Sequence, residues 1–153
     1  MAVAVHGRLV INHWFGIPTR DHVRRLEAIQ LDVCEELNGG RQLVCSAFQA
    51  SVGVRLPDDV RQEAVELSRR MNGKTLALGQ VVLGKGFFAS ILRSTLTGVT
   101  MASRPHYPQR VFSTFPTCGS WLARELEATI VGASGEEVTR VLRVYAEQLR
   151  QRP

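Results

Sequence analysis

The feature that most constrains the fold is the run TLALGQVVL at positions 75–83. The run is almost continuously apolar, which is typical of a central strand buried on both faces of a sheet. Two further runs, residues 2–6 and 9–15, are rich in β-branched residues, and only Gly7 and Arg8 separate them. Such a short connection predicts a β-hairpin at the start of the sheet.

Segments with helical periodicity alternate with the apolar runs, and turn or capping residues mark where each begins or ends. The predicted strands are residues 2–6, 9–15, 42–48, 75–83 and 110–113, and the predicted helices begin near Thr19, Asp58, Phe87, Thr114 and Ser134. This order predicts a single α/β domain over residues 1–153, with a mixed sheet of about five strands and about five helices.

The last predicted helix, residues 134–150, is an addition at the C-terminal end of this pattern. It begins with Ser134-x-x-Glu137, the spacing of a capping box, and carries an apolar stripe that includes Val138 and Leu142. Because such a stripe is too apolar for a solvated tail, we expect this helix to pack against the rest of the domain.

Composition restricts the class of protein. The chain has 153 residues, of which 44% are hydrophobic, and it contains no run of about 18 apolar residues that could span a membrane. Its first ten residues lack the pattern of a secretory signal. The three cysteines form no C-x-x-C pair, which argues against disulfides and zinc. We therefore expect a cytoplasmic protein.

The segment Gly79–Lys85, GQVVLGK, matches most of a phosphate-binding P-loop. Three of its four middle residues, Val81, Val82 and Leu83, are apolar and partly β-branched, which favours an extended strand, and Gly86 stands where the motif has a serine or threonine. We therefore expect no nucleotide cofactor. Two alternatives stay open: Gly84 and Gly86 form a tight turn, or free helix amides with Lys85 and Arg93 bind a small anionic or lipid-like ligand.

Candidate catalytic and metal-binding residues are few. Cys118 is predicted in the first turn of a helix, where a thiol pKa can be lowered, but the nearest histidine in sequence is His106 and no base is evidently positioned. The other histidines, His6, His13 and His22, lack the spacing of metal ligands. We expect no catalytic and no metal site, and hence a non-enzymatic protein.

The net charge of +5 raises the question of a nucleic-acid partner. Arg20, Arg24 and Arg25 lie on the first predicted helix, but acidic residues such as Glu27 and Glu35 alternate with them. This mixture is typical of a solvated helix face rather than a basic patch, so nucleic-acid binding is not expected.

The stretch Leu83–Ser94, LGKGFFASILRS, together with the element order, resembles the STAS fold of sulfate transporters and anti-sigma-factor antagonists, and in particular its SpoIIAA-like group. The resemblance covers residues 1 to about 127. It implies a bacterial, cytoplasmic, non-enzymatic domain that acts by protein–protein contact. Phosphorylated antagonists carry Asp-Ser-Ser/Thr-Gly after the third strand, where this chain has only Ser51. A phosphorylation switch at Ser51 is therefore not expected.

These observations predict a protein-interaction module, regulatory or scaffolding, whose partner is another protein or a second copy forming a homodimer. The predicted contact surface is the start of the third helix, where glycines expose the backbone and two phenylalanines add aromatic area. The alternative is that both phenylalanines pack inward. The predicted contact residues are Gly84, Lys85, Gly86, Phe87, Phe88 and Arg93.

Overall fold

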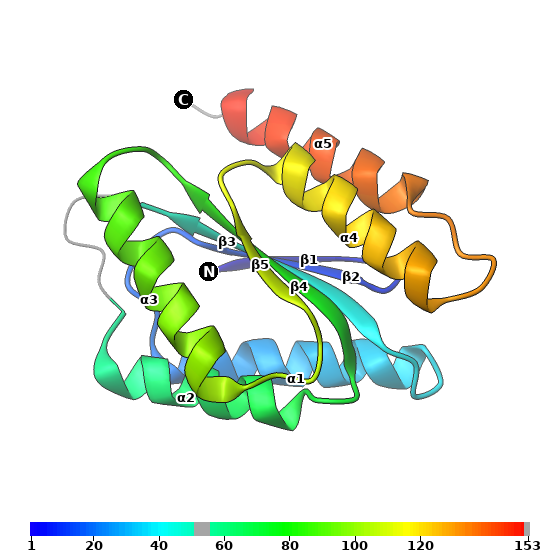
Figure 1. Cartoon of the computed structure of the whole chain (residues 1–153), viewed down its shortest axis with the longest axis horizontal. Helices are drawn as coiled ribbons and strands as arrows, with labels where there is room; N and C mark the ends of the chain where they lie inside the picture. The colour runs from blue at the N-terminus through cyan, green and yellow to red at the C-terminus, as the bar shows by residue number, and fades with distance from the viewer. Residues whose placement is uncertain (51–55, 152–153) are drawn as a thin grey trace.

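The computed structural model describes residues 1–50 and 56–151, which form a five-stranded sheet with helices on both faces (Figure 1). The strands are β1 (Ala2–His6), β2 (Leu9–Trp14), β3 (Gln42–Gln49), β4 (Thr75–Leu83) and β5 (Gln109–Phe112). The helices are α1 (Arg20–Glu36), α2 (Asp58–Arg70), α3 (Phe87–Ser103), α4 (Phe115–Thr129) and α5 (Glu136–Gln151). The predicted α/β fold with an opening hairpin is confirmed.

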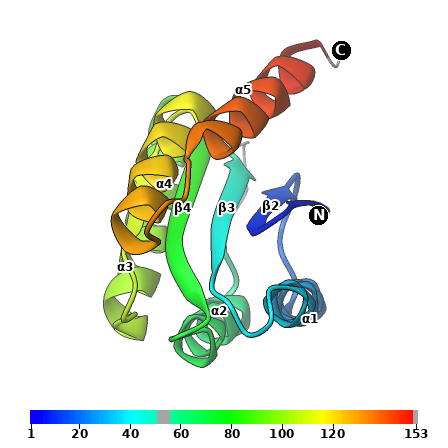
Figure 2. The same cartoon turned by 90° about the vertical axis from the view of Figure 1, so that its right-hand side faces the viewer.

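The strands are arranged in the order β1-β2-β3-β4-β5. The hairpin strands β1 and β2 are antiparallel, whereas β2, β3, β4 and β5 are parallel, so the carboxyl ends of four strands meet at one edge. Helices α1, α2 and α3 pack on one face of the sheet, and α4 and α5 pack on the other. Figure 2 shows α4 and α5 on the opposite side of the strands from α1 and α2.

The face covered by α4 and α5 is packed through residues with little or no side chain. Gly79 of β4 lies directly under Cys118, and a Cβ atom at Gly79 would overlap the Cys118 sulfur. A Cβ atom at Gly119 would lie 3.3 Å from Cβ of Leu142, and one at Gly135 would overlap the α4 backbone. Because a methyl group would overlap other atoms at Gly79 and Gly135 and would fit only tightly at Gly119, the helices lie close to the sheet and to each other.

In α5 the predicted packing of the apolar stripe is confirmed, whereas the predicted start of the helix is wrong. Val138, Val141 and Leu142 are buried in the core, as their spacing predicts. The helix begins at Glu136, however, and not at Ser134. The Ser134 hydroxyl accepts a hydrogen bond from the Glu136 amide, and the Glu137 carboxylate binds Arg140 instead of closing a capping box.

An ion-pair network joins α1 to α2. Glu63 of α2 is buried, and its carboxylate accepts hydrogen bonds from Arg20 at 3.3 Å and from Arg70 at 3.1 Å, with Arg24 at 3.8 Å. Arg70 also donates to the Glu27 carboxylate of α1. Burial alone raises the pKa of Glu63, but these arginines more than offset it and hold the pKa below its ordinary value.

Candidate functional site

The P-loop-like segment is a strand. Residues Gly79–Leu83 belong to β4, where Gly79 pairs with Cys45 of β3 and with Arg110 of β5. A strand with neighbours on both sides has its backbone amides committed to the sheet, so they cannot curl around a phosphate. The extended conformation predicted for this segment is confirmed.

Gly84 and Gly86 form the turn between β4 and α3. Their φ angles are +107° and +87°, a region that side chains strongly disfavour. A Cβ atom at Gly84 would also come within 3.2 Å of the Ala50 carbonyl oxygen. Of the two alternatives, the tight turn by itself accounts for both glycines. Lys85, between them, is exposed.

The two phenylalanines that open α3 are exposed to solvent. The exposed fraction is 73% for Phe87 and 37% for Phe88, and the two rings meet edge to face with centroids 5.8 Å apart. The alternative that both rings pack inward is therefore wrong. Exposed aromatic side chains at a helix start are a feature that folding alone does not require.

The exposed apolar surface continues along α3. Starting at Phe87, exposed uncharged residues follow one another at intervals of four, three, four and three positions along the outward face of the helix. These residues, here named the α3 seam, are Phe87, Ile91, Ser94, Gly98 and Met101. None of the five is charged, and all five are exposed. The opposite side of the helix is buried by Ala89, Leu92, Leu96 and Val99.

Gly98 stands in the middle of this seam. It lies well inside α3, and no atom would come within 4 Å of a Cβ atom placed on it. A glycine in an exposed helix interior destabilises the helix by about 1 kcal/mol relative to alanine. The packing of the chain therefore gives no reason for glycine at this position, whereas a second helix approaching closely would.

Basic residues surround the seam. Lys85 precedes α3, Arg104 follows it in a left-handed conformation, and Arg93 lies at its side, where it donates a hydrogen bond to the Ser113 hydroxyl at 3.3 Å. The charge of Lys85 is unfavourable beside the positive end of the helix dipole. The arrangement is an uncharged strip with positive charge at both ends and along one edge.

Cys118 is placed unlike a catalytic nucleophile. Its side chain is completely buried, with its sulfur 3.8 Å from that of Cys45. The hydrogen bond with Cys118 and the burial raise the pKa of Cys45 well above its ordinary value, which disfavours a thiolate at Cys45. His106 lies elsewhere, before the amino end of β5, where its backbone amide binds Asn72. The structure does not bring His106 and Cys118 together.

The arginines of the first helix are engaged with α2. Arg20 and Arg24 approach the Glu63 carboxylate, so they do not form an unpaired basic patch on that surface. Within residues 1–50 and 56–151, no cluster of three or more metal-binding side chains is found, and no helix is long and apolar enough to cross a membrane. Ser51 lies outside the described residues.

A row of buried polar side chains across the centre of the sheet was not predicted from the sequence. Asn12 of β2, Ser46 of β3 and Gln80 of β4 are register neighbours and are buried beneath α1 and α2. Asn12 accepts a hydrogen bond from the Trp14 indole at 2.8 Å, but within the described part of the chain its Nδ2 and the Oε1 of Gln80 have no partner. The available signal was that each residue interrupts an apolar strand.

Comparison with known proteins leaves the family open, because no family model, no curated protein and no solved structure matches the chain. The resemblance to the STAS group thus stays a prediction that rests on the stretch Leu83–Ser94 and on the element order.

Proposed function

We propose that the protein is an interaction module whose partner protein packs a helix along the α3 seam. The observation that carries this proposal is the seam itself, five exposed uncharged residues repeating every three or four positions. That spacing is the one by which helices meet in coiled-coil-like packing. Gly98 at its centre lets a partner helix approach the α3 backbone, and Phe87 and Met101 provide large apolar contacts at the two ends.

The charges around the seam define the chemistry of the partner. Lys85 and Arg104 flank the two ends, and Arg93 lies along one edge. An apolar helix with acidic residues beside its stripe complements this pattern, and such complementarity provides specificity and faster association. The proposed partner helix is therefore amphipathic and acidic.

A second copy of the chain fits this surface less well. If two copies of α3 packed antiparallel, Lys85 of each would approach Arg104 of the other, and if they packed parallel, each charge would approach its equivalent. Like charges facing one another disfavour both arrangements. We therefore propose a heterologous partner. The STAS resemblance supports the same class of function, a regulatory or scaffolding role in the bacterial cytoplasm.

The test is photo-crosslinking in cells of the source organism. A photoreactive amino acid replaces Met101 on the seam, and in a control it replaces Val144, an exposed apolar residue of α5. We expect one dominant protein product from position 101 that is absent from position 144. The crosslinked peptide of that product should lie in an acidic amphipathic helix.

The Gly98→Gln variant gives an independent check. Glutamine is a better helix former than glycine, so this variant should raise the free energy of unfolding by about 0.5 kcal/mol. Its side chain should nevertheless abolish the crosslink from position 101, because it occupies the place of close approach. The proposal fails if positions 101 and 144 give the same products, or if the folded Gly98→Gln variant crosslinks as the wild type does.

A further inference from the structure

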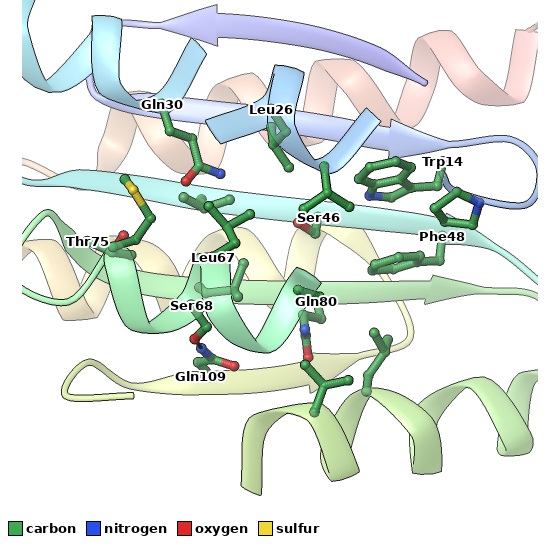
Figure 3. A pocket seen from close by; sticks show the side chains of 18 of the residues that line it. Trp14, Leu26, Gln30, Ser46, Phe48, Leu67, Ser68, Thr75, Gln80 and Gln109 are labelled. Atoms are coloured by element: carbon green, nitrogen blue, oxygen red, sulfur yellow. Dashed lines mark hydrogen bonds between the residues drawn. The ribbon is translucent and has the colours of Figure 1, made fainter. Parts of the chain in front are cut away.

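A cavity of about 100 Å³ lies between the sheet and the inner sides of α1, α2 and α3 (Figure 3). The stacked rings of Trp14 and Phe48, with centroids 6.2 Å apart, close one end. Leu26 of α1 and Leu67 of α2 cover it from above the sheet. Among the described residues that line it, none carries a charge. The cavity therefore offers a mainly apolar environment without a counter-ion.

Gln80 places a carboxamide among these apolar walls. Its side chain extends from β4 among the lining residues, beside Ser46 of β3 (Figure 3). Only 6% of Gln80 is exposed, and its Oε1 has no hydrogen-bond partner among residues 1–50 and 56–151. A buried carbonyl oxygen that accepts no hydrogen bond is unfavourable in a folded protein. A bound molecule that donates a hydrogen bond to this oxygen would remove the cost.

The other carboxamides of the wall are bonded within the protein. Gln30 accepts a hydrogen bond from Gln42 at 3.1 Å, and Gln109 donates to the Ser68 hydroxyl at 3.0 Å. These pairs belong to the fold and hold the edges of the cavity together. Gln80 differs from them because its Oε1 lies in the wall of the cavity and accepts no hydrogen bond from any residue that the structure describes.

The size of the cavity exceeds the needs of a single bound water. One water requires about 10–15 Å³ of such space, and a cavity of about 150 Å³ with apolar walls is large enough to bind benzene. Of the polar residues in the wall, Gln30, Ser68, Tyr107 and Gln109 already form hydrogen bonds within the protein, so several waters here would lie mainly against leucine, valine and aromatic side chains. An organic molecule with an apolar body satisfies both the walls and Gln80.

We propose that this cavity binds a small uncharged molecule, with an apolar body the size of one ring and one hydroxyl or amide group hydrogen-bonded to Gln80. This site is separate from the α3 seam. Leu96 and Val99 line the cavity from the inner side of α3, whereas Gly98 and Met101 face outward. The failure of one proposal therefore leaves the other standing.

The chain offers a built-in reporter, because Met71 lines the cavity and is 1% exposed, whereas Met101 lies on the seam and is 73% exposed. The full-length protein is labelled with ¹³C-methyl methionine and titrated with phenol, and separately with toluene, which has a methyl group in place of the hydroxyl. We expect both probes to shift the Met71 signal and not that of Met101. Phenol should bind about tenfold more tightly than toluene, because only phenol can bond to Gln80.

Two variants separate specific binding from other effects. Gln80→Leu should retain binding of both probes but lose the preference for phenol. Ala64→Leu extends a side chain from α2 into the cavity, and a folded Ala64→Leu protein should show no shift at Met71. A Met71 signal that neither probe moves up to its solubility limit overturns the proposal, as does a phenol preference that persists in Gln80→Leu.

Discussion

The two faces of the sheet differ at the centre of β4, and two adjacent residues of this strand show the difference. Gly79 faces the α4 side, where the Cys118 sulfur occupies the place that a Cβ atom would need. Gln80 points to the α1 and α2 side, where it lines a cavity and where its Oε1 has no partner among the described residues. At this point of the sheet, one face is closed by packing, and the other leaves space next to a polar group.

The two sides of β4 differ in which features serve to stabilise the fold and which do not. Close packing through glycine and alanine accounts for the α4 and α5 face, since every cavity left in a core reduces stability. The α1–α3 face contains both the cavity and the helix with the uncharged outer seam. The Gln80 cavity and the α3 seam therefore belong to the same side of the sheet, and substitutions can compare this side with the contacts at Gly79 and Leu142.

The largest expected effect is on the closed face. Leu142 of α5 is completely buried against α4 and the sheet, so Leu142→Ala should lower the free energy of unfolding by about 3 kcal/mol. The matched variant Leu67→Ala removes the same atoms from the wall of the cavity, where they have fewer neighbours, and should lower it by about 1 kcal/mol. Urea denaturation measures both, and equal losses would contradict the comparison.

The second effect concerns Gly79. Gly79→Ala should lower the free energy of unfolding by about 2 kcal/mol, because its methyl group would overlap the Cys118 sulfur. In the Cys118→Ala background the sulfur is absent, so the same substitution should have little effect. Gly98→Ala is the control on α3: nothing opposes its methyl group, and the protein should become more stable by about 1 kcal/mol. Additive losses from Gly79→Ala and Cys118→Ala would exclude this contact as the cause.

The third effect concerns the ion pairs that join α1 to α2, the two helices that cover the cavity. Because the pKa of Glu63 lies below its ordinary value of 4.5, its ion pairs stabilise the fold above that pH, and the contribution is lost as pH falls through the lowered pKa. Glu63→Gln should lower the free energy of unfolding by about 1.5 kcal/mol at pH 7. Between pH 5 and the folded pKa, the difference between wild type and Glu63→Gln should shrink. A difference independent of pH down to about 2 would show that the carboxylate charge is not involved.

Most of the fold could be predicted from local patterns. The apolar run at 75–83 is β4 without an error at either end, and Thr19 and Thr114 cap α1 and α4 through their side chains. The start of α5 was misplaced because the Ser134-x-x-Glu137 spacing permits a capping box without requiring one. Short-range sequence patterns fix the elements but not which competing hydrogen bond forms.

The candidate sites were predictable only in part. The sequence of α3 has apolar residues on most sides, so it could not decide which of them face outward, and the seam becomes apparent only once the sheet occupies the other side. Gln80 lies inside a predicted central strand, but its missing partner depends on side chains from three helices. Contacts between residues far apart in sequence determine both features.

The last and smallest effect tests the central claim, that the α1–α3 face keeps a polar group free at the expense of stability. Gln80→Met replaces the carboxamide with an apolar side chain of similar shape, and its free energy of unfolding is compared with that of the wild type by urea denaturation in the absence of any added ligand. Because the Oε1 of Gln80 has no partner among the residues that the structure describes, its removal should leave the protein equally stable or more stable by up to about 1 kcal/mol. A loss of more than about 1 kcal/mol would mean that Gln80 makes a bond the fold depends on, and would contradict the account.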